Sequence, residues 1–378
     1  MKIVLAPDSF KGSLTAKEAT DLMKSAIHDV NRGIQIVKKP MADGGEGTIH
    51  ALLEAMDGDT IPVTCTGPLG KRIETEYGII DSKTAVIECA NIAGLLQVPR
   101  EQRNPDMTTS YGIGEVIIDA LDKGYESFIV GLGGSATNDG GLGMLLALGM
   151  KAFDQDGLEV GKFGKDLDHI HSVSFSDLDP RLAHVDIKIA SDVNNPLYGS
   201  LGASRVFGPQ KGATAEQVTC YDKHLKKFGT LVERILKKPL ADIPGAGAAG
   251  GLGFAFLAIG ATLESGAALL ADAMDMDEAI ASADLVITGE GQSDEQTLYG
   301  KAPGHIASIA ASYNVPVILI SGSIEGDIDL LSRHFAGYFS IVNKPLPLEA
   351  CMKEADRLLY EKTNMVIHMI DSLMKLNE

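Results

Sequence analysis

The sequence predicts a two-domain α/β protein, in which both chain ends form one parallel domain and a mixed α/β domain is inserted between them. Strand-like and helix-like segments alternate over residues 1–60 and again over residues 284–378, which is typical of parallel sheets covered by helices. Short apolar runs separated by turn residues follow Thr60 and indicate antiparallel strands. The 378 residues also exceed the length at which one core stops growing. Residues 61–283 are therefore expected to form the inserted domain.

The N-terminal part of the parallel domain is predicted to begin with a buried strand over residues 2–6. Thr15 and Glu18 have the spacing of a capping box, and apolar residues follow at helical spacing as far as Val30. A strand over residues 34–37, a glycine loop and a helix that ends near Met56 complete a βαβα unit. This pattern indicates a flavodoxin-like or Rossmann-like sheet.

The remaining elements follow from the same periodicities. In the inserted domain, strands are expected over residues 61–65, 72–80, 85–88, 127–130 and 187–190, and helices over residues 113–121 and 215–236. Thr214 and Gln217 form a second capping box. The C-terminal part of the parallel domain is expected to contain strands over residues 285–288, 317–320 and 338–342 and a helix over residues 306–311.

Composition excludes several classes of function. The formal net charge of −18 argues against a surface that binds nucleic acid or an anionic membrane. The four cysteines, Cys65, Cys89, Cys220 and Cys351, have no zinc-site spacing and are expected to be buried in a reducing compartment. Pro7, Asp8 and Lys11 interrupt the first apolar run too early for a signal peptide, so we expect a cytoplasmic protein. The oligomeric state stays open.

Five glycine-rich segments with polar side chains are the main functional signal. The clearest is GLGGSATNDGG, residues 131–141, which follows a strand-like run and precedes a helix-like one. Such a loop presents free backbone N–H groups and a positive helix end to an anion. The other four lie within residues 6–13, 42–47, 191–213 and 288–301. Each combines glycines with a carboxylate or an ammonium group, as sites for Mg²⁺ and phosphates require.

No phosphate loop of the GxxxxGK[ST] type is present, so a P-loop fold is excluded. The GAGAAG sequence from Gly245 to Gly250 matches a dinucleotide-binding pattern, but it follows Pro244 and no strand. We therefore expect a glycine-rich helix start packed against another backbone or a ligand. Because ligands bind at the carboxyl ends of parallel strands, the five loops are expected to build one site between the domains.

Taken in order, the motifs APDSFKGS, DGGEGT, GLGGSATNDGG, SDVNNPLYG with FGPQKGA, GAGAAGGLG and DLVITGEG with QT…GK resemble those of the bacterial glycerate kinase family, of the glycerate 2-kinase type. The resemblance extends from Lys2 to about Val342. It implies a two-domain α/β fold and phosphorylation of D-glycerate by ATP with Mg²⁺, with 2-phosphoglycerate as product. His305 departs from the pattern, which affects the start of one helix.

This chemistry singles out candidate residues. Asp192 is the favoured general base because a rigid turn follows it, and Lys11 and Asp43 are the further catalytic candidates. Metal ligands are expected among carboxylates: Asp139, Glu290 and Asp294. Substrate and phosphate groups are expected to contact hydroxyls, lysines and loop glycines: Ser9, Ser13, Gly44, Gly45, Gly133, Gly134, Ser135, Thr137, Asn138, Lys211 and Lys301.

Three alternatives stay open. The product could be 3-phosphoglycerate, because residue types do not distinguish the two hydroxyls. Another enzyme of small hydroxy acids, a ligase or a dehydratase, would use a similar loop set. A non-catalytic metabolite sensor would keep the same fold, although the intact set of acidic residues argues against lost catalysis. Measurement of ADP release with and without D-glycerate separates these alternatives from a kinase.

Overall fold

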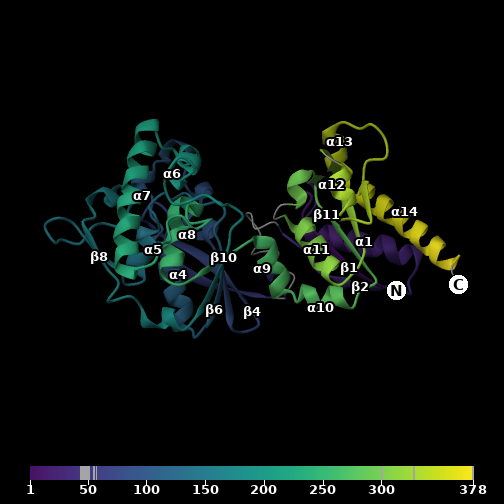
Figure 1. The fold of residues 1–378 in the computed structure, drawn as a ribbon, viewed down its shortest axis with the longest axis horizontal. Helices are drawn as coiled ribbons and strands as arrows, with labels where there is room; N and C mark the ends of the chain where they lie inside the picture. Colours follow the sequence, from purple (N-terminus) through teal and green to yellow (C-terminus); the bar gives the residue numbers. More distant parts are fainter. Residues whose placement is uncertain (43–51, 54–55, 57, 299–300, 327, 377–378) are drawn as a thin grey trace. The chain divides into compact units, whose positions relative to one another are not determined.

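The computed structural model describes residues 1–42, 52–53, 56, 58–298, 301–326 and 328–376 (Figure 1). The described chain divides into two compact units. Among the described residues, the first unit contains 1–42, 52–53, 267–298, 301–326 and 328–376, and the second contains 56 and 58–266. Both chain ends thus belong to the first unit. The expected helix before Met56 lies mainly outside the described residues.

The first unit is built on a five-stranded parallel sheet with the order β15-β13-β11-β1-β2. Its strands are β1 (Lys2–Pro7), β2 (Gln35–Lys38), β11 (Leu285–Gly289), β13 (Val317–Ser321) and β15 (Gly337–Ser340). Ile3 of β1 lies opposite Leu285 on one side and Ile36 on the other, so segments from both chain ends pair directly. This strand order is flavodoxin-like, which confirms the predicted fold class.

Helices cover both faces of this sheet. Helix α1 (Ala16–Val30) packs against α14 (Ala355–Lys375), and both share a core with Leu5 and Ile287 (Figure 1). Helix α11 (Ala302–Ser312) contacts β1, β11 and β13 but contributes no residue to that core, so it lies on the opposite face. The shorter elements are α9 (Gly266–Ala273), α10 (Met276–Ala281), β12 (Gln292–Ser293), β14 (Ser323–Ile324), α12 (Ile328–Ser332) and α13 (Leu348–Lys353).

The second unit contains a six-stranded mixed sheet with the order β10-β9-β6-β5-β4-β3. Its strands are β3 (Asp59–Thr66), β4 (Arg72–Ile80), β5 (Thr84–Glu88), β6 (Ser127–Gly131), β9 (Asp186–Ala190) and β10 (Thr262–Glu264). The pairs of β4 with β3 and with β5 are antiparallel, as expected. The pairs of β6 with β5 and with β9 are parallel, as is that of β9 with β10. Strand β5 is therefore where the sheet changes from antiparallel to parallel.

Helices and a small second sheet complete this unit. They are α3 (Cys89–Ala93), α4 (Tyr111–Asp122), α5 (Leu142–Ala147), α6 (Ala203–Phe207), α7 (Ala215–Leu236), α8 (Ala248–Ala258), and the strands β7 (Lys151–Phe153) and β8 (Ser172–Ser174). Single 3-10 turns lie at Leu95–Gln97, Arg100–Gln102, Pro105–Met107, Gly164–His169, Pro180–Ala183 and Pro209–Lys211, and one more in the first unit at Glu295–Leu298.

Both predicted capping boxes are confirmed. Thr15 Oγ1 accepts a hydrogen bond from Glu18 N at 3.2 Å, and Glu18 Oε2 accepts one from Thr15 N at 2.9 Å. Thr214 and Gln217 make the same reciprocal pair at the start of α7. Each box satisfies backbone donors that the first helical turn leaves unpaired. Local sequence therefore determines where α1 and α7 begin.

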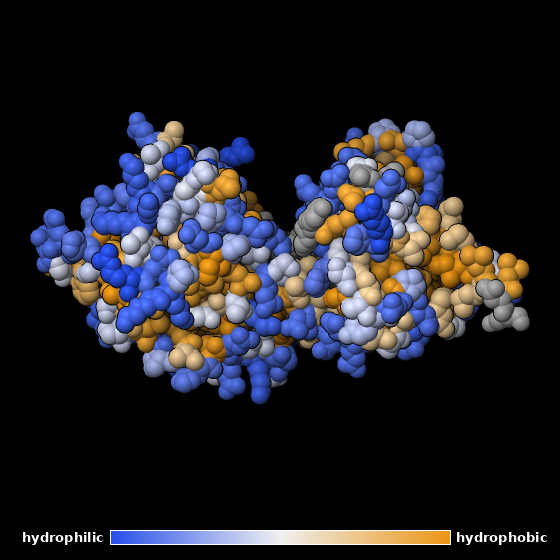
Figure 2. All heavy atoms as spheres, viewed as in Figure 1, coloured by the Kyte–Doolittle hydropathy of each residue, from blue (hydrophilic) through white to orange (hydrophobic). Residues whose placement is uncertain are grey.

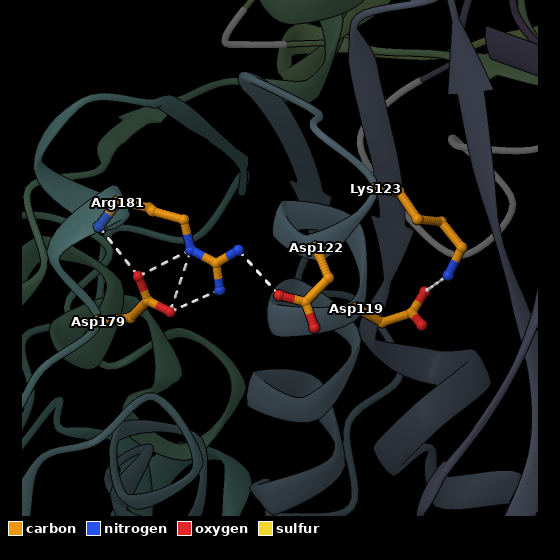
Figure 3. A network of polar contacts seen from close by, with 5 residues as sticks. All are labelled: Asp119, Asp122, Lys123, Asp179 and Arg181. Atoms are coloured by element: carbon orange, nitrogen blue, oxygen red, sulfur yellow. Dashed lines mark hydrogen bonds and ion pairs between the residues drawn. The ribbon is translucent and has the colours of Figure 1, made fainter.

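A surface ion-pair network joins α4 to the turn at Pro180–Ala183 (Figure 3). The Arg181 guanidinium binds both carboxylate oxygens of Asp179 and reaches Asp122 at 2.8 Å, while Lys123 pairs with Asp119. The Arg181 hydrogen bonds lower the pKa of Asp179. Because these groups remain partly exposed to solvent, the network orients the two segments more than it stabilises them.

Residues 267–283 differ from expectation. The sequence pattern predicts that they belong to the inserted domain, but α9 and α10 belong to the first unit. Lys39, next to β2, donates a hydrogen bond to the Met274 carbonyl, and Lys2 Nζ donates to Ser282 Oγ at 2.6 Å. These long-range bonds attach the segment to the parallel sheet. Sequence periodicity cannot predict such hydrogen bonds, because it describes only local structure.

Candidate active site

A cavity of about 550 Å³ lies at the carboxyl ends of the parallel strands of the first unit. Part of its lining comes from the segments that follow four strands: Ser9 after β1, Glu290 after β11, Ser323 after β13 and Ile341 after β15. Strands β1 and β11 flank the point where the strand order reverses. Ligands of open α/β sheets bind at this position, so the topology and the cavity agree.

Six predicted site residues line this cavity: Ser9, Lys11, Ser13, Glu290, Asp294 and Lys301. They come from two motifs at opposite ends of the chain. The parallel pairing of β1 with β11, with Pro7 opposite Gly289, brings the two motifs together.

The loop after β1 is a tight turn that presents Lys11. Buried Phe10 anchors it, because the Phe10 carbonyl accepts hydrogen bonds from Ser13 N, Ser13 Oγ and Leu14 N. Gly12 has a φ of +80°, and a Cβ at Gly12 would lie 2.7 Å from Met352 Cε. The positive φ favours glycine at the tip, whereas the flexible end of the Met352 side chain could move aside. The Ser13 hydroxyl is engaged within the loop, whereas Lys11 is exposed.

Glu290 is a buried carboxylate with three protein partners in the cavity wall. Its Oε1 accepts hydrogen bonds from Ser293 Oγ at 2.9 Å and Thr297 Oγ1 at 2.6 Å, and Lys301 Nζ lies 3.5 Å from its Oε2. Two hydroxyls thus hold one oxygen and leave the other beside the ammonium group. Asp294, just after β12 in the same segment, accepts a hydrogen bond from Gln296 N at 2.8 Å.

In the second unit, the predicted anion loop between β6 and α5 is mostly buried. Ser135, Thr137 and Asn138 are at most 5% exposed, while Gly134 is exposed and Gly133 is partly so. Lys211 Nζ donates hydrogen bonds to Ser135 Oγ at 3.0 Å and to the Thr137 carbonyl at 2.6 Å. The loop therefore offers its glycine segment to solvent and keeps its polar side chains inside.

Asp139 is fully buried and saturated by hydrogen bonds. Its carboxylate accepts bonds from Ser110 N at 2.9 Å, Ser110 Oγ at 2.7 Å, Gly141 N at 3.1 Å and Gly143 N at 3.3 Å. Burial raises the pKa of Asp139, and these hydrogen bonds oppose that effect. The geometry is that of a carboxylate that holds a loop together.

Lys211 is a buried ammonium group in the same region. Burial lowers its pKa from the ordinary value of 10.5 to about 7, against the opposing charge of Asp139. Two neighbouring side-chain atoms, Thr137 Oγ1 and Asn138 Oδ1, are buried and have no hydrogen-bond partner within the described part of the chain. The inside of this loop is thus polar, and the hydrogen-bonding capacity of its buried side chains is only partly used within the described part of the chain.

The GAGAAG segment packs directly on this loop. A Cβ on Gly250 would lie 2.0 Å from the Thr137 carbonyl oxygen, and Gly140 N donates a hydrogen bond to the Gly250 carbonyl at 3.0 Å. Ala249, Gly250 and Gly251 also have left-handed backbone angles. The prediction of a glycine-rich helix start packed against another backbone is confirmed.

Asp192 follows β9 in the second unit and is exposed. Its Oδ1 accepts a hydrogen bond from Gly266 N at 3.1 Å. Asn195 stabilises the turn that follows, since its Nδ2 donates to the Leu201 carbonyl at 2.8 Å and its carbonyl accepts from Gly247 N at 2.8 Å. The remaining candidates, Asp43, Gly44 and Gly45, lie outside the described residues.

Comparison with known proteins identifies the family. A profile of the glycerate kinase family matches residues 3–371. The chain belongs to the glycerate kinase family. It is 46% identical to glycerate kinase of Bacillus subtilis, with 94% of each chain covered, and 45% identical to glycerate 2-kinase of Escherichia coli, with 88% of each covered. A crystal structure from Salmonella typhimurium LT2, provisionally named glycerate kinase 2, superimposes with a TM-score of 0.89 at 43% identity over 99% of both chains.

Members of this glycerate kinase family are kinases, so the chain is an enzyme. The family match continues beyond Val342, where the motif resemblance ended, and includes α13 and most of α14. His305 does not disturb the start of α11, which begins at Ala302. Burial lowers the pKa of His305.

Part of the cavity lining was not predicted from the sequence. Asp8 is buried and lines the cavity, and its place directly after the first strand could have indicated it. Leu348, Cys351 and Met352 of α13 and Ala355 at the start of α14 form an apolar wall. No motif marks these residues, because their position depends on how the C-terminal helices fold back onto the sheet.

The carboxylates at the cavity suit a metal ion that a phosphate ligand also coordinates. Among the residues that the structure describes, no three His, Cys, Asp or Glu side chains cluster in a way that could hold a metal ion. Mg²⁺ usually takes one or two carboxylates together with substrate phosphates and water. Glu290 and Asp294 provide such a pair at the cavity.

No helix in the described chain is long and apolar enough to span a membrane.

Proposed function

We propose that the protein transfers a phosphoryl group from ATP to D-glycerate, with Mg²⁺ as the metal and 2-phospho-D-glycerate as the product. Membership of the glycerate kinase family supports the reaction and the substrate. The name of the Escherichia coli relative, glycerate 2-kinase, supports the 2-hydroxyl as the acceptor. The observation that carries the proposal is the cavity of the first unit, where two lysines and three carboxylates from separate loops converge.

The proposed chemistry needs charge neutralisation and positioning. The glycerate hydroxyl oxygen forms a bond to the γ-phosphorus, the bond to the bridging oxygen of ADP breaks, and the hydroxyl proton passes to a base. Lys11 and Lys301 are assigned to phosphate oxygens. Glu290 and Asp294 are assigned to Mg²⁺, which supplies charge neutralisation at the phosphates when bound. The hydrogen bonds to Glu290 Oε1 orient this carboxylate before any ligand arrives.

In the second unit we assign the general base to Asp192, an exposed carboxylate at the end of β9. The exposed backbone at Gly133 and Gly134 is assigned to an anionic group of a substrate. Asp139 and Lys211 receive a different role from the one expected from sequence. Both are buried and bonded to the glycine loop, so we assign them to positioning that loop.

Two measurements test the proposal. ADP release should depend on D-glycerate, and phosphorus NMR of the product should show phosphate on the 2-hydroxyl. A dehydratase would form no phosphorylated product, a ligase would consume ATP only with a second acceptor, and a sensor would bind glycerate without release of ADP. Product with phosphate on the 3-hydroxyl would contradict the regiochemistry and leave the kinase assignment intact.

A further inference from the structure

We propose that the cavity of the first unit is the nucleotide site, and that it takes a magnesium-bound adenine nucleotide. The base lies against the apolar wall formed by α13 and the start of α14, and the phosphates lie at the loops after β1 and β11. This inference rests on the proposed kinase function and adds to it where the whole nucleotide lies and which residues contact its base.

The size and lining of the cavity distinguish the two substrates. A volume of about 550 Å³ is within the usual range of roughly 300–1,000 Å³ for drug-sized ligands and far exceeds what a three-carbon acid fills. Glycerate carries a carboxylate and two hydroxyls and has no apolar face to bury. The apolar wall, which includes Leu348 and Met352, therefore has no role toward glycerate. A purine ring is flat and apolar on both faces and suits such a wall.

The apolar and charged parts of the cavity adjoin one another. Met352 Cε lies next to Gly12, the residue that follows Lys11, so the apolar wall adjoins the loop that carries Lys11. Lys301 approaches Glu290 at the other motif. A ligand that fills the cavity would thus contact both an apolar surface and ammonium groups. Nucleotides have this division between base and phosphates.

The charge of the lining predicts the form of the nucleotide. Three carboxylates, Asp8, Glu290 and Asp294, and two lysines, Lys11 and Lys301, line the cavity. Their formal charges leave an excess of negative charge, which repels a free polyphosphate. A divalent cation bound to the phosphates reverses this repulsion and uses the same carboxylates as ligands. Binding should therefore require Mg²⁺.

Cys351 provides a reporter at this site in the unmodified protein. It lines the cavity and is half-buried, whereas Cys220 on α7 of the second unit is exposed. The exposure of these two residues departs from the expectation that all four cysteines are buried. Cys65 and Cys89 are buried, and burial raises their pKa, that of Cys65 to about 11, so they react slowly. Alkylation can thus be followed at Cys351 with Cys220 as an internal control.

The experiment measures iodoacetamide alkylation of each cysteine in the full chain by mass spectrometry. At ten times its Kd, MgADP should slow alkylation of Cys351 about tenfold, in proportion to site occupancy, and leave Cys220 unchanged. ADP with a chelator, or D-glycerate alone, should protect little. No protection by MgADP, equal protection by glycerate, or equal slowing at Cys220 would overturn the proposal.

A matched pair of variants tests the wall. Leu348→Glu changes a residue of the cavity that is 76% exposed, and Leu376→Glu changes one beyond α14 that is 81% exposed and does not line the cavity. Both should fold, and only Leu348→Glu should raise the Kd for MgADP, by about tenfold if one apolar contact of about 1.4 kcal/mol is lost. Equal Kd values in both variants would contradict the proposal.

Glycerate phosphorylation, assayed in the same preparation, separates this inference from the proposed function. Product formation without protection of Cys351 would mean that the nucleotide binds elsewhere while the kinase assignment stands. Protection by MgADP without any product from D-glycerate would support the nucleotide site and refute the proposed reaction.

Discussion

The ammonium nitrogen of Lys211 lies 2.6 Å from the carbonyl oxygen of Thr137, inside a loop that the sequence indicates as an anion-binding site. The lysine is 2% exposed and also donates to Ser135 Oγ. Its side chain therefore takes part in the loop's internal structure. The loop exposes its glycine backbone to solvent, and the buried lysine and Asp139 maintain its conformation.

Lys211 should make stability depend on pH. Its pKa is about 7 in the folded protein and near 10.5 when exposed, so between these values the unfolded chain holds a proton that the folded protein has lost. The free energy of unfolding should therefore rise with pH over this window. Urea unfolding should show this rise for the wild type and a smaller one for Lys211→Met. The exposed Lys223→Met is the control, and identical pH slopes in wild type and Lys211→Met would contradict the prediction.

Asp139→Asn should destabilise the second unit. The carboxylate accepts four hydrogen bonds, and an amide places a donor where acceptors are needed. A loss of about 2–3 kcal/mol in the free energy of unfolding is expected for a buried charged acceptor. The Mg²⁺ concentration for half-maximal activity should stay unchanged. A large shift in that concentration with unaltered stability would instead support Asp139 as a metal ligand.

Glu290→Gln should change the metal requirement. The amide oxygen can still accept from Ser293 and Thr297, but the charge that attracts Mg²⁺ is gone. We expect the half-maximal Mg²⁺ concentration to rise at least about tenfold, roughly the loss of one charged contact. Glu295→Gln, an exposed residue in the same segment, should leave it unchanged. A normal Mg²⁺ titration of Glu290→Gln would remove this residue from the metal site.

Lys11→Ala should lower turnover at least about tenfold with little effect on stability, because an exposed loop lysine contributes charge to the site and little to the core. Lys11→Arg should also be poor, since the guanidinium differs in shape and hydration. Steady-state kinetics and thermal unfolding measure the two effects. The exposed Lys17→Ala serves as the control. Full activity of Lys11→Ala would exclude Lys11 from the active site.

Asp192→Asn should nearly abolish phosphoryl transfer and leave folding intact, because the amide cannot accept the hydroxyl proton. Asp186→Asn, at the other end of β9 and also exposed, is the matched control. General-base catalysis contributes about 10²–10⁴-fold in rate. If single-turnover measurements show that Asp192→Asn keeps more than about a tenth of the rate, the base is another residue, and Asp43 is the next to test.

Several features could be predicted from the sequence because they depend on local chemistry. The starts of α1 and α7 follow from capping boxes whose partners are three residues apart. The buried strands β1, β11 and β13 follow from short apolar runs with turn residues on both sides. The close packing at Gly250 follows from a glycine pattern without a preceding strand. In each case the information lies within a few residues.

Other features were decided by tertiary structure, because they depend on pairings between segments far apart in the chain. Ser9 and Glu290 line the same cavity because β1 pairs with β11, and no local pattern specifies that pairing. The sequence marked Asp139 as a carboxylate in a glycine loop, but the folded chain buries it against Ser110. The apolar wall at Leu348 has no motif at all. The sequence alone thus determined which loops combine glycines with charged side chains and where the local elements begin, whereas the long-range packing decided which of those side chains line the cavity and which are buried.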